Sequence, residues 1–212
     1  MLEYTPLAEK ILVVLAIVQG IILMPAFIEL LPYLADSLFR ARGSVALENS
    51  VRVSRNRNRV AAVLLLPSML MVFRLRLWEP SVMDRLSPEG QLGAVAIVFV
   101  AYILLRIVMF WVLKPRHRYD NFVLSHRAGY TFFILMMILL LSTWGICRVF
   151  QVPDEAIRVV IFVEICVVYA AFLFRRAQFL SLSYRPLRTF LYLCGLEIVP
   201  AAVWVVSALV LK

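Results

Sequence analysis

Four charged residues stand well inside stretches of sequence that are mostly apolar, away from the charged residues near the ends of those stretches. They are Glu29, Arg106, Glu164 and Glu197. An ionised side chain that faces lipid is costly, so each of them should face other helices or a water-filled cavity. Groups in this position carry protons, hold ions or pair with one another. These four residues are therefore the candidates for chemistry in this chain.

The depth of these residues within their apolar runs indicates which of them meet. Glu197 lies roughly 12 Å beyond Thr189 at about 1.5 Å per residue, and Arg106 lies at a comparable depth from the matching end of its run. Opposite charges at equal depth should pair, because each would otherwise be stranded in a low dielectric. We predict an ion pair between Arg106 and Glu197, with Glu29 or Glu164 as a second partner. A cluster that only fixes helix register is favoured over a proton relay or a ligand site.

Other kinds of chemistry find little support in the sequence. His117 and His126 lie in a basic segment, and their spacing matches no common metal motif. Ser181 and Ser183 have no histidine or lysine at helical spacing that would act as a base. The sequence also lacks a glycine-rich phosphate loop and an HExxH motif. We therefore predict no metal, no cofactor and no catalytic residue, and hence a protein that is not an enzyme.

The composition requires a membrane protein. Of the 212 residues, 63% are hydrophobic and only 17% are charged, whereas a soluble domain is about 45 to 50% apolar. The net charge of +9 comes mainly from arginines between the apolar runs. Arginines in this position indicate topology and contact with anionic lipid headgroups rather than binding of nucleic acid. We predict an all-α, polytopic bundle of transmembrane helices that forms a single integral membrane domain over residues 1–212.

Basic loops alternate with poorly charged ones along the chain. The segments 35–59 and 114–128 are rich in arginine and should be cytoplasmic loops, which leaves both termini outside the cytoplasm. The run 60–78 is the least regular, because Arg74 and Arg76 interrupt it, and we favour a span there over a re-entrant or interfacial segment. Six spans are predicted in all, near residues 7–34, 60–78, 91–113, 129–150, 156–174 and 189–211.

The segment 54–59 reads Ser-Arg-Asn-Arg-Asn-Arg. Arginines two residues apart point around the axis of a helix, but they share one face of an extended strand. The run lacks the interleaved aromatic residues that stack on bases, so nucleic acid is disfavoured as a partner. We predict a loop that contacts the membrane surface or a partner protein through Arg52, Arg55, Arg57 and Arg59.

The run 190–200 reads Phe-Leu-Tyr-Leu-Cys-Gly-Leu-Glu-Ile-Val-Pro. It resembles the C-terminal signature Leu-Tyr-x-Cys-x-Leu-Glu-x-x-Pro of an uncharacterised family of small polytopic inner-membrane proteins from Gram-negative bacteria, a domain of unknown function. The Arg-Asn-Arg-Asn-Arg run at 55–59 is similar to a basic stretch that precedes the second span in that family. The resemblance implies the inner membrane of a bacterial cell, where termini outside the cytoplasm lie in the periplasm, and it transfers no activity. It singles out Tyr192, Cys194, Leu196, Glu197 and Pro200.

Two functions of different kinds are compatible with these patterns. The first is a non-enzymatic subunit or assembly factor of an envelope complex, which binds other membrane proteins and anionic lipid headgroups. The second is a small transporter or channel for a proton-coupled or anionic, lipid-like solute, in which Glu164 and Glu197 titrate and Arg106 holds the anion. A water-filled cavity around these residues would favour the second function, and closure by neighbouring helices would favour the first.

Overall fold

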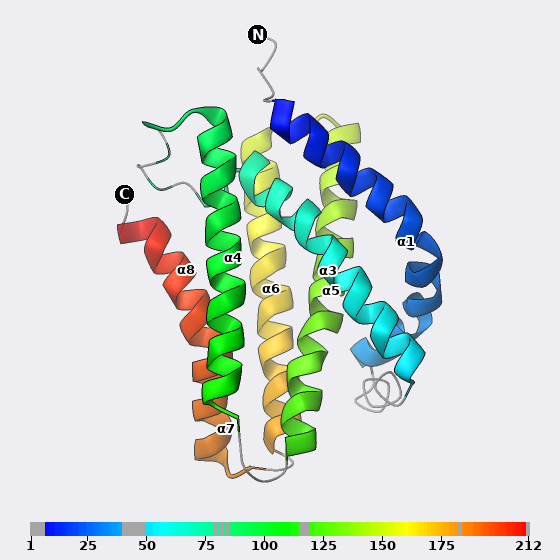
Figure 1. The fold of residues 1–212 in the computed structure, drawn as a ribbon, viewed down its shortest axis with the longest axis vertical. Helices are drawn as coiled ribbons and strands as arrows, with labels where there is room; N and C mark the ends of the chain where they lie inside the picture. Colours follow the sequence, from blue (N-terminus) through cyan, green and yellow to red (C-terminus); the bar gives the residue numbers. More distant parts are fainter. Residues whose placement is uncertain are drawn as a thin grey trace. The chain divides into compact units, whose positions relative to one another are not determined.

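The computed structural model describes residues 7–39, 50–78, 80, 83, 85–114, 119–181 and 184–210, and these residues form helices and turns without a strand (Figure 1). This confirms the predicted all-helical membrane fold. The last helical stretch of the chain is continuous and consists of three elements, α7, η2 and α8. The helices are α1 (Leu7–Phe39), α3 (Val51–Arg74), α4 (Pro88–Val112), α5 (Tyr119–Val149), α6 (Asp154–Ser181), α7 (Pro186–Leu193), η2 (Cys194–Ile198) and α8 (Val199–Val210).

Five helical segments in the described part of the chain are long and apolar enough to cross a membrane. They coincide with five of the six predicted spans, which supports a multi-pass membrane protein. Their bounds are Leu7–Leu34, Pro88–Val112, Ser125–Val149, Asp154–Ser181 and Pro186–Val206.

The remaining helix, α3, differs from the predicted span over 60–78. It begins earlier, at Val51, and ends at Arg74, after which the chain turns and Arg76 adopts a φ of 47°. Because arginines lie at both ends of α3, this helix is not among the five that are long and apolar enough to cross a membrane. An apolar stretch of 14 residues, from 60 to 73, is about 21 Å long, which is short for a hydrocarbon core of about 30 Å. That α3 crosses the membrane therefore stays a prediction.

Much of both predicted basic loops is helical, so the loop prediction is wrong for those parts. Within 35–59, α1 continues to Phe39 and α3 begins at Val51; within 114–128, α5 begins at Tyr119. The physical reason is that arginine is a good helix former, and a helix at the edge of a bundle needs only one apolar face. Residues 40–49 and 115–118 lie outside the described part of the chain.

The helix ends follow local rules. Ser87 caps α4 by accepting a hydrogen bond from the Gly90 amide at 3.2 Å, and Pro88 occupies the first helical position. Acidic residues fill the first turn of α6, where they favour the positive end of the helix dipole. Pro25 and Pro32 lie inside α1, and Figure 1 shows this helix bending along its length, as expected where a proline removes a backbone donor.

The chain forms two compact units, and the two are interleaved along the sequence. Unit 1 contains Met1–Val13, Met69–Phe122 and Leu173–Lys212, and unit 2 contains Val14–Ser68 and Val123–Phe172. In unit 1, one cluster of buried side chains consists of Phe122, Leu180 and Leu196, and another of Val72, Trp78, Met83 and Val95. In unit 2, the buried cluster consists of Leu30, Leu34, Val53, Val60, Ala61 and Ile134.

Candidate functional site

Glu197 lies in a wide helical turn in the last span. The turn is η2, and the amide of Val199 donates to the carbonyl of Cys194, five residues earlier. Pro200 follows directly. In a regular α-helix its ring would clash with the carbonyl four residues before it, and the wider turn relieves this clash. Turns of this kind recur at functional sites, because they move side chains out of the regular helical register.

Two arginines hold the Glu197 carboxylate within unit 1. Nη2 of Arg106, on α4, donates to Oε1 of Glu197 at 2.8 Å, and Nη1 of Arg176, near the end of α6, pairs with the same oxygen. The Glu197 and Arg176 side chains are each 1% exposed, whereas that of Arg106 is 26% exposed. We call these three residues the Glu197 cluster. It contains the predicted pair of Arg106 and Glu197, and neighbouring helices enclose the carboxylate.

Aromatic and aliphatic side chains surround this cluster. Tyr192 packs edge-on against Phe122 and Tyr184, with ring centroids 5.5 and 5.2 Å apart. Leu196 is fully buried in the same hydrophobic core. Gly195 leaves room for the Leu113 side chain at the end of α4, since an added Cβ atom would lie 2.6 Å from Cδ1 of Leu113. The apolar surroundings strengthen the electrostatic attraction within the cluster.

The other motif residues have less distinctive surroundings. Cys194 carries a free thiol, is half-buried and begins the wide turn, and Pro200 is buried just after it. Their positions account for the shape of the turn rather than for any reaction.

Glu29 belongs to a different cluster, in unit 2. Its carboxylate pairs with Nε of Arg52 at 3.1 Å and accepts a hydrogen bond from Nδ2 of Asn56 at 3.0 Å. The Arg52 side chain is 79% exposed and that of Glu29 33%. Glu29 and Glu164 both belong to unit 2, so the prediction that one of them joins Arg106 and Glu197 stays a prediction; within unit 1, the third member of that cluster is Arg176.

Glu164 lies near the middle of α6 and bonds to α5 within unit 2. Oγ1 of Thr143 donates to its Oε1 at 2.6 Å. Its second oxygen, Oε2, is buried and has no hydrogen-bond partner in the described part of the chain. One carboxylate oxygen is thus satisfied and the other is not, which is unusual for a buried polar group.

The position of Arg57 differs from the one predicted for the arginine run. Its side chain is buried, so it does not contact lipid headgroups or a partner as expected. Its Nη2 donates to Oδ1 of Asn58 at 2.9 Å and to Oγ of Ser54 at 3.3 Å, and its guanidinium lies 5.8 Å from the ring centre of Tyr130 on α5. The reason is helical geometry: residues two apart point in roughly opposite directions, so Arg57 faces inward where Arg55 faces outward.

Sequence reasoning missed Arg176 as a member of the site. The predicted span over 156–174 ends just before Arg175 and Arg176, so neither residue was among the candidates inside an apolar run. Adjacent residues on a helix point about 100° apart, so one of two neighbouring arginines turns toward the other helices. The available signal was therefore the doubled arginine itself, at the same membrane side as Arg106.

The described residues offer no group of three His, Cys, Asp or Glu side chains that would hold a metal ion. His126 packs edge-on against Tyr130 at 6.0 Å, and His117 lies outside the described residues. What this arrangement does chemically is to neutralise and orient charges between helices.

No family model, no curated protein and no solved structure matches this chain. The resemblance based on the last span therefore stays a prediction, and the function has to be argued from the geometry of the chain itself.

Proposed function

We propose that this protein is a non-enzymatic subunit or assembly factor of a membrane-protein complex, in the inner membrane of a bacterial cell and with both termini in the periplasm. In this role the helices form a scaffold on which other membrane proteins assemble. A scaffold needs a fixed surface and no site of its own, and the six helical stretches in the described part of the chain suit that requirement.

The observation that carries the proposal is the closure of the Glu197 cluster. The side chains of Glu197 and Arg176 are each 1% exposed. The guanidinium groups of Arg106 and Arg176 both pair with the same carboxylate oxygen of Glu197. A group that carries protons or solute has to be reached by water or by the solute during the transport cycle. A group that fixes the course of a helix does not. Closure therefore favours a structural role for Glu197.

The Glu197 cluster sets the course of the last span, and that span has an apolar outer surface. Leu187, Phe190 and Leu191 on α7 are exposed, as are Val203 and Val206 on α8. Such side chains face lipid or an apolar partner helix. Changing the cluster would loosen the contacts of this span with α4 and α6 and so alter this surface without touching it directly.

The experiment is affinity purification of the tagged protein from a mild detergent, followed by mass spectrometry of co-purifying membrane proteins. The native chain is compared with Glu197→Gln and with Glu164→Gln, a matched removal of an intramembrane carboxylate from the other unit. We expect a stable set of partners with the native chain and Glu164→Gln, and loss of that set with Glu197→Gln. Size-exclusion chromatography of each variant checks that it remains folded. A well-folded protein that purifies alone in every case would refute the scaffold function.

One observation supports the rival function of a small transporter or channel. Glu164 lies mid-span with a buried oxygen that lacks a hydrogen-bond partner in the described residues, and carboxylates inside spanning helices mark ion and proton pathways in transporters. Proton flux into liposomes distinguishes the two functions. A flux that the native protein supports and Glu164→Gln abolishes would favour the transporter.

A further inference from the structure

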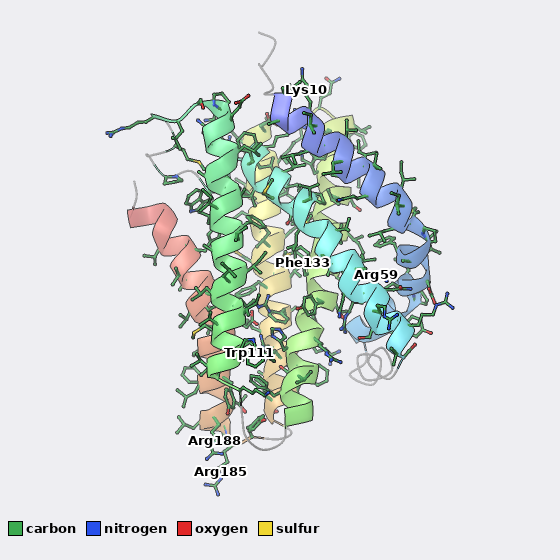
Figure 2. All side chains as sticks on the ribbon, viewed as in Figure 1. Lys10, Arg59, Trp111, Phe133, Arg185 and Arg188 are labelled. Carbon is green, nitrogen blue, oxygen red and sulfur yellow. The ribbon has the colours of Figure 1, made fainter. Side chains whose placement is uncertain are left out.

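One face of the first half of α3 carries three exposed arginines. Arg52, Arg55 and Arg59 are separated by three and four residues, which is the spacing of neighbours along one side of a helix. Figure 2 labels Arg59 on this helix. We call these three residues the basic stripe.

The opposite face of α3 fixes the direction in which the basic stripe points. Val53 and Val60 are buried in the core of unit 2 with Leu30 of α1 and Ile134 of α5. Arg57 is buried between them on the same face and lies over the Tyr130 ring. This anchored face leaves α3 little freedom to rotate about its axis, so the stripe is directed away from the core of unit 2.

The contact with α1 gives the depth of the stripe in the membrane. Arg52 pairs with Glu29, and the side chains of Ile28 and Leu31 beside Glu29 are 57% and 42% exposed. Exposed apolar side chains inside a spanning segment belong in lipid. Glu29 precedes the end of that segment, Leu34, by roughly 8 Å at about 1.5 Å per residue. The stripe therefore begins where hydrocarbon gives way to headgroups.

Arg55 and Arg59 also have unused hydrogen-bonding capacity. In the described ranges, neither guanidinium has an ion-pair or hydrogen-bond partner, whereas Arg52 is committed to Glu29. A guanidinium binds a phosphate group through two parallel hydrogen bonds, and phosphate is the anion found at this depth.

We propose that the basic stripe binds the phosphate groups of anionic phospholipids, so that the first half of α3 lies in the headgroup layer as an interfacial helix. A protein partner with an acidic surface is the competing occupant. Lipid is favoured because the exposed Ile28 and Leu31 beside the stripe require hydrocarbon at the same place. This inference is independent of the scaffold function.

The test uses the full-length protein in phosphatidylcholine vesicles that contain a small fraction of a photoactivatable lipid, either phosphatidylglycerol or phosphatidylcholine with the same acyl chains. After illumination, mass spectrometry maps the labelled peptides. In the native protein we expect the peptide that contains the stripe to be labelled preferentially by phosphatidylglycerol. The double variant Arg55→Gln/Arg59→Gln should weaken this labelling by about 25-fold, because each arginine near a charged surface contributes roughly a factor of 5. Raised salt should weaken it as well.

The matched control is Arg185→Gln/Arg188→Gln, which removes the same charge from two exposed arginines on the same predicted side of the membrane. Figure 2 shows both side chains extending from the start of α7. This variant should leave labelling of the stripe unchanged. Equal labelling by the two lipids in the native protein, or equal loss in both double variants, would overturn the proposal. Absence of lipid labelling, together with an acidic protein that co-purifies only when Arg55 and Arg59 are present, would assign the stripe to a protein partner instead.

Discussion

Each unit contains a glutamate paired with an arginine from another helix, and the two pairs differ in almost every physical respect. In unit 1, Glu197 is 1% exposed and shares one carboxylate oxygen between two arginines. In unit 2, Glu29 is 33% exposed and its arginine, Arg52, is 79% exposed. The carboxylate of the first pair lies in a wide helical turn beside a hydrophobic core, and the second pair lies at the surface of unit 2.

The difference shows how surroundings decide what an ion pair does. A buried pair holds its helices in one arrangement, because removal of either partner leaves an uncompensated charge in a low dielectric. An exposed pair is screened, and it exchanges easily with solvent or with lipid headgroups. We therefore propose a structural role for Glu197 and a surface role for the region around Glu29. The following variants test whether the two regions differ in this way.

Removal of the Glu197 carboxylate should have the largest effect. Glu197→Ala leaves the buried guanidinium of Arg176 and the partly exposed one of Arg106 without their carboxylate, which should lower the free energy of unfolding by about 3–5 kcal/mol. The measurement is reversible unfolding in mixed detergent micelles, followed by circular dichroism. A loss below about 1 kcal/mol, the value typical of exposed pairs, would contradict the structural assignment.

The two arginines of the cluster should differ in importance. Arg176→Gln should cost about 2 kcal/mol, which is typical of a lost hydrogen bond to a charged group, whereas Arg106→Gln should cost about 1 kcal/mol because its side chain is partly exposed. The same unfolding assay measures both values. If Arg106→Gln proved the more damaging, Arg176 would be a secondary member of the cluster.

The close approach at the wide turn predicts a smaller effect. A Cβ atom at Gly195 would lie 2.6 Å from Leu113, whereas one at Gly93 in α4 would meet nothing within 4 Å. Both substitutions to alanine gain the same helix propensity, so Gly195→Ala should be less stable than Gly93→Ala by about 1–2 kcal/mol. Thermal unfolding of the two variants gives the difference. Equal stabilities would mean that Leu113 moves aside without cost.

The smallest effect should follow loss of the exposed pair. Glu29→Ala should change the free energy of unfolding by less than about 1 kcal/mol, and that change should shrink further in high salt. The unfolding assay at low and high salt tests both parts. If Glu29→Ala lowered the free energy of unfolding as much as Glu197→Ala does, and independently of salt, the two glutamates would not differ in their structural role.

The membrane fold was predictable to a large extent, and the site only in part. Five spans follow from apolar runs long enough to cross a bilayer. The pairing of Arg106 with Glu197 follows from their similar depth. That depth can be calculated from the sequence, because each residue of a helix adds a fixed rise along its axis. The helical state of the arginine run was missed, since its apolar residues Val53 and Val60 are too widely spaced to stand out beside so many charges.

The sequence by itself determined the membrane class, the helical fold and the depth of each intramembrane charge, because hydropathy and helical rise are local properties that add along the chain. Tertiary structure alone decided that Arg176 joins Glu197, that Arg57 turns inward while Arg55 and Arg59 remain exposed, and that Glu29 pairs with Arg52. Those choices depend on the rotation of each helix about its own axis. That rotation is set by packing between residues far apart in the sequence, which no local pattern contains.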